Sequence, residues 1–184
     1  MPKINCERDK YLWIYEQSKN KSYGKRNFGF GAYEIILNLQ PQSLLDVGCG
    51  RGRLVEWAKT QGIDAVGLDF ASGYGVCADL VDMPFDDNSF DVVTAFDVLE
   101  HLRHEDLELG LDEICRFAKS HLVLSIGYGP SKVMTPEGPL QLHPICTRDR
   151  QWWTPILARR GKVNYEGKTI SADPYIIIEL GKER

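Results

Sequence analysis

The stretch that decides the fold occupies residues 44–54 and reads Leu44-Leu45-Asp46-Val47-Gly48-Cys49-Gly50-Arg51-Gly52-Arg53-Leu54. An apolar run meets an acidic residue, three glycines follow at alternate positions, and an apolar helical pattern begins. This order predicts a buried strand, a tight turn and the start of a helix. Glycine permits a positive φ and lets a ligand approach the backbone, because it has no Cβ. The N–H groups at the start of the helix then favour an electron-rich or anionic ligand group.

The spacing of the glycines differs from that of the dinucleotide-binding fingerprint. They give G-x-G-x-G, whereas the dinucleotide fingerprint G-x-G-x-x-G would need a glycine where Arg53 stands. A glycine triplet alone is also compatible with a plain tight turn. Two further apolar runs also end near an acidic residue. Asp69 follows residues 65–68, and Asp79 lies within residues 78–80. Acidic residues at these positions favour the view that the glycine turn binds a ligand over the view that it is a plain tight turn.

With these residues in place, the chain resembles the class I S-adenosylmethionine-dependent methyltransferases. The resemblance implies an α/β fold, namely a Rossmann-like, seven-stranded, mostly parallel sheet with helices on both faces. It also implies that Asp69 binds the cofactor ribose and that Asp79 accepts a hydrogen bond from the adenine amino group; a turn-capping role is the alternative for Asp79. The residues expected to bind S-adenosylmethionine are Arg26, Asp46, Gly48, Cys49, Gly50, Asp69, Phe70, Asp79, Leu80 and Phe96.

Composition bounds the class of protein. Hydrophobic residues make up 43% and charged residues 26% of the 184 positions, which is ordinary for a globular domain. A net charge of −4 argues against strong non-specific binding to nucleic acid. The five cysteines are scattered without a C-x-x-C pair, which suits a reducing compartment. No run approaches a membrane span and the N-terminus lacks an apolar signal core, so we expect a cytoplasmic protein.

We expect one domain over residues 1–184, with three parts: an N-terminal helical lid segment (1–40), a cofactor-binding core (41–128), and a substrate loop, helix and closing hairpin (129–184). The predicted helices span about 10–18, 32–39, 52–60, 107–117 and 148–158. The predicted strands span about 43–47, 65–68, 91–96 and 122–126, with a hairpin from 163–170 and 175–180. Residues 127–144 are rich in glycine and proline and are predicted to form a long loop.

Two segments depart from a simple pattern. Residues 23–31 combine glycines, basic groups and aromatics, and are either a surface linker or a lid in which Arg26 or Lys25 faces the methionine carboxylate. From Asp69 to Asp79 there are only ten positions. Because a parallel crossover with a helix needs about a dozen residues or more, we expect the helix between the second and third strands to be absent.

The chemistry is expected just after the strand at 91–96. If the segment from Asp97 opens a helix, the spacing i, i+3, i+4 places Asp97, Glu100 and His101 on one face, where they could hold a divalent cation. The segment resembles the Glu-x-x-Glu-His motif of two metal-dependent O-methyltransferase groups, of which one modifies small-RNA 3′ ends. That resemblance adds a later histidine, His143. The expected metal ligands for Mg²⁺ or Mn²⁺ are therefore Asp97, Glu100, His101 and His143.

Two alternatives to the metal site stay open, because Asp97 replaces the glutamate of the motif and Val-Leu-Glu-His also occurs in methyltransferases not known to need metal. His101 could act as a general base without metal, or Glu100 and His101 could only order the site. The candidate catalytic residues are His101, His143 and Glu100.

The sequence therefore predicts a methyltransferase that uses S-adenosylmethionine, acts on a hydroxyl group of a small molecule or glycan, and has no membrane partner. One alternative is a 2′-O-methyltransferase of RNA 3′ ends. The other is a protein that binds S-adenosylmethionine without turnover. The acceptor and the oligomeric state are left open.

Overall fold

The computed structural model describes residues 7–17, 29–71, 73–77, 84–135, 138–142, 148–169 and 173–181. The strands are β1 (Ser43–Val47), β2 (Asp64–Leu68), β3 (Phe90–Phe96), β4 (Ala118–Ser125), β5 (Lys132–Thr135), β6 (Gly138–Gln141), β7 (Gly161–Glu166) and β8 (Tyr175–Leu180). The helices are α1 (Glu7–Gln17), α2 (Gly29–Leu39), α3 (Arg53–Thr60), α4 (Leu107–Phe117) and α5 (Arg150–Ala158), with short 3₁₀ turns η1 (Leu99–His101) and η2 (His104–Asp106).

Within these ranges the strands form a six-stranded sheet in the order β2-β1-β3-β4-β8-β7 and a separate hairpin, β5-β6. Strands β2, β1, β3 and β4 run parallel, whereas β8 is antiparallel to β4 and to β7. This is the predicted Rossmann-like α/β class, with six of the seven predicted strands described. A single parallel bridge from Leu68 to Val76 stands where the seventh strand was expected, and residues 78–83 lie outside the described part.

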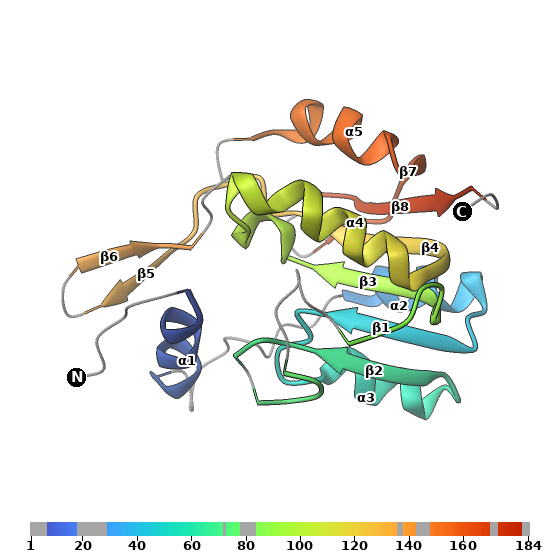
Figure 1. Cartoon of the computed structure of the whole chain (residues 1–184), viewed down its shortest axis with the longest axis horizontal. Coiled ribbons are helices and arrows are strands. Elements are labelled where there is room, and N and C mark those ends of the chain that lie inside the picture. The colour runs from blue at the N-terminus through green and yellow to red at the C-terminus, as the bar shows by residue number, and fades with distance from the viewer. Residues whose placement is uncertain are drawn as a thin grey trace.

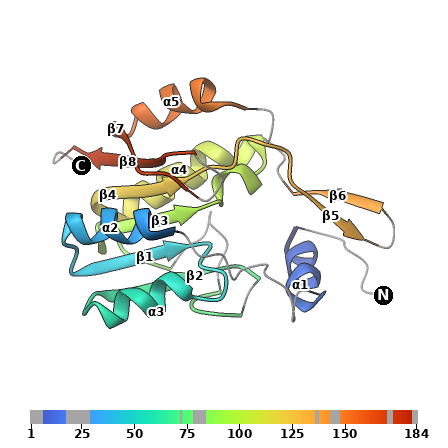
Figure 2. The same ribbon diagram turned by 180° about the vertical axis from the view of Figure 1, so that it is seen from behind.

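The helices cover both faces of the sheet (Figures 1 and 2). Successive residues of a buried strand point to opposite faces, and both faces of these strands are apolar. On one face, Leu45, Val93 and Leu122 pack with α4 and α5. On the other face, Leu44 and Val92 pack with α2 and α3. The uninterrupted apolar runs in the sequence therefore follow from burial on both sides.

The connection after β2 is short, as its sequence predicts. Its described residues form bends and the Val76 bridge, and contain no helix. Gly75 has a φ of 71°, and a Cβ there would lie 2.2 Å from the carbonyl oxygen of Gly67. Glycine is thus required for the chain to return directly alongside β2.

The hairpin β5-β6 corrects the prediction of a featureless loop over residues 127–144. Gly138 and Pro139 are typical of loops by composition, but here they belong to β6 and pair with Thr135 and Met134 of β5. The hairpin projects from the body beyond α1 (Figure 1). None of the helices in the described residues is long and apolar enough to cross a membrane.

Candidate active site

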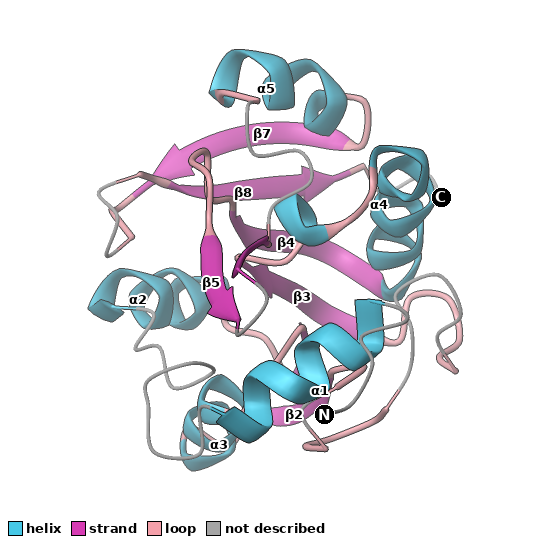
Figure 3. Ribbon diagram, turned by 90° about the vertical axis from the view of Figure 1, so that its left-hand side faces the viewer, coloured by secondary structure: helices cyan, strands magenta, loops and turns pink. Residues whose placement is uncertain are grey.

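The four parallel strands end at one edge of the sheet, and the predicted site residues follow those ends. The glycine turn follows β1, Asp69 follows β2, residues 97–101 follow β3 and Gly127 follows β4. Figure 3 looks onto this edge, with α1 lying across it. Ligands of open α/β sheets bind at this position.

The turn after β1 has the predicted glycine geometry. Gly48, Gly50 and Gly52 have φ values of 67°, 56° and 72°. A Cβ on Gly48 would lie 2.4 Å from Val98, and one on Gly52 would lie 2.1 Å from the ring of Tyr74. The backbone conformation therefore requires glycine at all three positions, and close neighbours add a second requirement at Gly48 and Gly52.

Asp69 is buried and fixed beside this turn. Its Oδ2 accepts hydrogen bonds from the N–H of Gly50 at 3.0 Å and from the hydroxyl of Tyr15 at 3.3 Å. Its Oδ1 accepts from the N–H of Ala71 at 2.9 Å. The carboxylate that the sequence assigns to the ribose thus lies at the edge of the sheet, joined to the glycine turn.

Asp46 is a buried carboxyl group with an unusual environment. Burial raises its pKa to about 7; the hydrogen bond from Thr94 opposes this rise, and the charge of Asp69 adds to it. Oδ1 accepts from the Thr94 hydroxyl at 2.7 Å, while Oδ2 has no hydrogen-bond partner among the described residues. A ligand that brings a positive charge or an N–H donor would satisfy Asp46. Burial also raises the pKa of the neighbouring Cys49 thiol, which keeps it protonated.

The segment after β3 differs from the predicted helix. Asp97 has a φ of 54°, and residues 99–101 form the short 3₁₀ turn η1 in place of an α-helix. Asp97 Oδ1 accepts from the hydroxyl of Ser125 at 2.8 Å, and Glu100 Oε1 accepts from the N–H of Gly127 at 2.7 Å. Both carboxylates are therefore engaged at the end of β4, and the assumption that residues 97–101 present one helical face was wrong.

The divalent metal site is not supported by this arrangement. Within the described part of the chain, no three His, Cys, Asp or Glu side chains are grouped so as to hold a metal ion. Asp97, Glu100 and His101 therefore do not form such a group by themselves. The fourth predicted ligand, His143, lies outside the described residues.

His101 is half-buried, and its Nδ1 contacts two oxygens. Its Nδ1 lies 3.0 Å from the carbonyl oxygen of Leu142 and 2.5 Å from the hydroxyl of Tyr11. A carbonyl oxygen can only accept, so the contact with Leu142 requires the proton on Nδ1. In the neutral ring the lone pair is then on Nε2, which is the form of a histidine that can accept a proton there.

Helix α1 contributes Tyr11 and Tyr15, which were not among the predicted site residues, to this edge of the sheet. Tyr11 is buried in a small cluster with Ile14, Ala71 and Leu142. The ring of Tyr11 lies 5.3 Å from that of Phe70, between centroids. Two tyrosines at positions 11 and 15 of an aromatic helix were the available signal, because residues four apart share a helix face. Helix α1 thus lies across this edge of the sheet, and its role as a lid stays a prediction.

The other predicted cofactor-binding residues differ in burial, and three of them lie outside the described part of the chain. Phe70 is half-buried beneath α1, whereas Phe96 is buried with its ring centroid 5.7 Å from that of Tyr175. Arg26, Asp79 and Leu80 lie outside the described residues.

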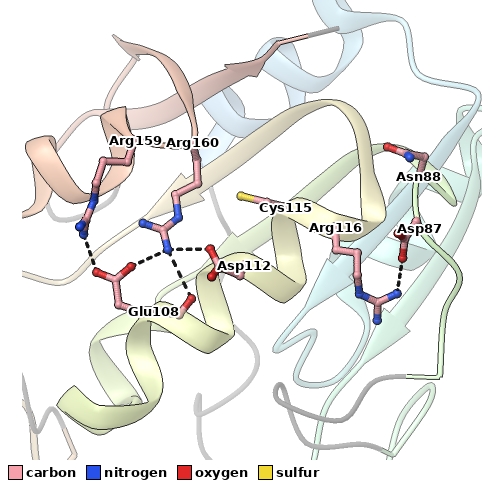
Figure 4. A pocket seen from close by; sticks show the side chains of 8 residues that line it. All are labelled: Asp87, Asn88, Glu108, Asp112, Cys115, Arg116, Arg159 and Arg160. Carbon is pink, nitrogen blue, oxygen red and sulfur yellow. Dashed lines mark hydrogen bonds and ion pairs between the residues drawn. The ribbon is translucent and has the colours of Figure 1, made fainter. Parts of the chain in front are cut away.

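A cavity of about 580 Å³ lies away from this edge (Figure 4). It is lined by Asp87, Asn88, Glu108, Asp112, Cys115, Arg116, Arg159 and Arg160. Residues 87–88 precede β3 and residues 159–160 precede β7, which places the cavity toward the amino ends of these strands. Its arginines bond Asp87, Glu108 and Asp112, so the cavity is lined by ion pairs and contains none of the predicted site residues.

Comparisons with known proteins agree with this fold. Residues 45–125 match the family model described as a methyltransferase domain. The chain is similar to a SAM-dependent methyltransferase from Methanosarcina mazei, at 18% identity and a TM-score of 0.64 over 80% of this chain and 97% of that one.

Two further similar structures carry more specific names. One is an amino pentose methyltransferase from Micromonospora echinaspora solved with SAM bound (17% identity, TM-score 0.64, 91% of this chain and 97% of that one). The other is 1,6-didemethyltoxoflavin-N1-methyltransferase from Burkholderia thailandensis (16% identity, TM-score 0.62, 94% of this chain and 85% of that one). At these identities the likeness concerns the fold.

Proposed function

We propose that the chain is a class I S-adenosylmethionine-dependent methyltransferase, which the match of residues 45–125 to a methyltransferase domain supports, and that it methylates a hydroxyl group of a small molecule or sugar, with His101 as the general base. The observation that carries the proposal is the contact between His101 Nδ1 and the carbonyl oxygen of Leu142 at 3.0 Å, which leaves the ring lone pair on Nε2.

The residues around the glycine turn fit S-adenosylmethionine. Asp69 offers a fixed carboxylate for the ribose hydroxyls, and Gly48 and Gly50 allow the cofactor to pass close to the backbone. Asp46 is a buried acid whose unbonded Oδ2 suits the positively charged methionine end. When bound, the cofactor supplies an electrophilic methyl group on a sulfonium.

The protein has two tasks beyond binding the cofactor. It must align the acceptor with the methyl group, and it must remove a proton from a hydroxyl acceptor. Nε2 of His101 takes that proton in the proposed reaction. Glu100 is buried and bonded to the N–H of Gly127, so it fixes the 3₁₀ turn that carries His101.

A metal-assisted version remains the alternative for the same acceptor. In it, His143 would join residues 97–101 around an ion that lowers the pKa of the hydroxyl. The described carboxylates favour the metal-free version, because each has a hydrogen-bond partner at the end of β4.

Small acceptors are favoured over RNA by the net charge of −4. Similar structures include methyltransferases of an amino pentose and of a toxoflavin precursor, which supports a small acceptor. The second of these acts on nitrogen by its name, so a nitrogen acceptor is the second candidate. RNA 3′ ends and cofactor binding without turnover are the remaining alternatives.

The test is labelled methyl transfer to separate pools of sugars, small hydroxyl compounds, amines and RNA, each with and without EDTA. We expect label in a hydroxyl or sugar pool, unaffected by EDTA, and lost in His101→Gln. His121→Gln is the matched control, because His121 lies on β4 and bonds Ser120 instead. Label only in RNA or amines would overturn the acceptor class, and loss of activity with EDTA would favour the metal version.

A further inference from the structure

Two tyrosines of α1 reach opposite halves of the site. The Tyr11 hydroxyl lies 2.5 Å from Nδ1 of His101, which follows β3. The Tyr15 hydroxyl donates to Oδ2 of Asp69, which follows β2, at 3.3 Å. Residues four apart lie on one face of a helix, so both contacts come from the same side of α1.

Tyr11 is fixed independently of its contact with His101. Its side chain is 6% exposed and belongs to the cluster with Ile14, Ala71 and Leu142. Its ring centroid lies 5.3 Å from that of Phe70 and 5.6 Å, edge-on, from that of His101. Because packing holds the ring, the hydroxyl oxygen is presented to Nδ1 at little further cost in side-chain entropy.

Two oxygens therefore face the same ring nitrogen. The carbonyl of Leu142 requires the proton on Nδ1, so the Tyr11 oxygen accepts from the same N–H. When Nε2 takes a proton, the ring becomes a cation and its Nδ1–H becomes a stronger donor. Both oxygens then stabilise the charged ring and hold its orientation.

We propose that Tyr11 is a positioning residue for His101, which fixes the ring and its Nδ1–H form so that Nε2 faces the acceptor. This inference rests on the proposed function, in which His101 is the base. It assigns a role in turnover to α1, a helix that lies outside the residues that match the methyltransferase domain.

The first test is nitrogen NMR of the histidine side chains in the full chain, with S-adenosylmethionine as the only ligand. We expect His101 in the Nδ1–H form in both proteins, because the Leu142 carbonyl still accepts, but with a shifted Nδ1 signal in Tyr11→Phe, which keeps the ring and loses the hydroxyl. Tyr33→Phe is the control, because Tyr33 stacks on Trp57 of α3. An unchanged His101 signal in Tyr11→Phe overturns the inference.

The second test separates this inference from the proposed function. With labelled S-adenosylmethionine and the acceptor pool that takes label, Tyr11→Phe should lower kcat by about tenfold to a hundredfold, the loss typical of one hydrogen bond to a charged group. The KM for S-adenosylmethionine should stay within about twofold, since the hydroxyl that is removed contacts His101 and the ring packed on Phe70 is kept. Tyr15→Phe should instead raise that KM.

Two results would separate the role of Tyr11 from the assignment of His101 as the base. If His101→Gln is inactive but Tyr11→Phe keeps its kcat, Tyr11 has no positioning role and the base assignment stands. If His101→Gln keeps full activity, the base assignment fails and this inference fails with it. Melting temperatures of both tyrosine variants establish that the rates refer to folded protein.

Discussion

The N–H of Gly50 donates to Oδ2 of Asp69 at 3.0 Å, and this bond joins the glycine turn after β1 to the acidic residue after β2. Two features that lie nineteen residues apart in the chain are thus joined on one side of the proposed cofactor site. Each can be removed separately, which makes the site testable.

Asp69→Asn should weaken S-adenosylmethionine binding by at least about tenfold. The change replaces a carboxylate that accepts charge-assisted bonds with an amide that has a single acceptor oxygen, and such bonds contribute about 1.5–3 kcal/mol each. Isothermal titration calorimetry measures the effect. Asp64→Asn, at the exposed start of the same strand, is the control and should bind normally. Equal affinities for the two variants would exclude Asp69 from the site.

Gly50→Ala should abolish most of the rise in melting temperature that S-adenosylmethionine gives the wild type. Gly62→Ala is matched to it, because Gly62 also has a positive φ, of 80°, yet a Cβ there meets nothing within 4 Å. Both variants should lose about 1 kcal/mol of stability from the left-handed backbone. Only Gly50→Ala should lose the response to cofactor. Normal stabilisation of Gly50→Ala would mean that the turn is purely structural.

The buried acid Asp46 should make stability depend on pH. Its pKa rises from an ordinary value of 3.8 to about 7 on folding, so the native state holds a proton that the unfolded state has released. This contribution is fully present below pH 3.8 and is lost as the pH rises to about 7. Urea denaturation should therefore show Asp46→Asn gaining stability relative to the wild type across that interval. A difference that does not vary with pH would contradict the assignment.

The cavity beside α4 should contribute to stability and not to cofactor binding. Arg160 is 7% exposed and bonds Glu108, Asp112 and the carbonyl of Ile156. Its loss removes several bonds and buried packing, so Arg160→Ala should cost about 2–4 kcal/mol. Arg159→Ala removes an exposed pair with the same Glu108 and should cost about 1 kcal/mol or less. Chemical denaturation measures both, and calorimetry should find unchanged cofactor affinity in each.

Much of the fold was predictable because its signals are local. The residues Leu44 and Leu45 are both apolar because the strand is buried on two faces, and α4 was predicted with the bounds that the structure has. The hairpin β5-β6 was not predicted, because Pro139 and Gly138 are loop residues by composition and only pairing across the turn makes them strand residues.

The site was predictable in part for the same reason. The glycines of the turn after β1 have the positive φ values that their spacing predicts, since backbone geometry constrains them, and the cofactor role built on them stays a prediction. The partners of His101 were not predictable, because Tyr11 lies 90 positions away and Leu142 contributes a backbone carbonyl that any residue could supply. The metal prediction assumed a helix from Asp97, and its φ of 54° breaks that geometry.

The central claim is that this chain transfers a methyl group with His101 as a metal-free base. The most direct measurement is transfer of labelled methyl from S-adenosylmethionine to hydroxyl acceptors by the wild type, His101→Gln and His121→Gln, each with and without EDTA. We expect equal product from the wild type and His121→Gln in both conditions, and none from His101→Gln. Full activity of His101→Gln, or product that disappears with EDTA, would contradict it.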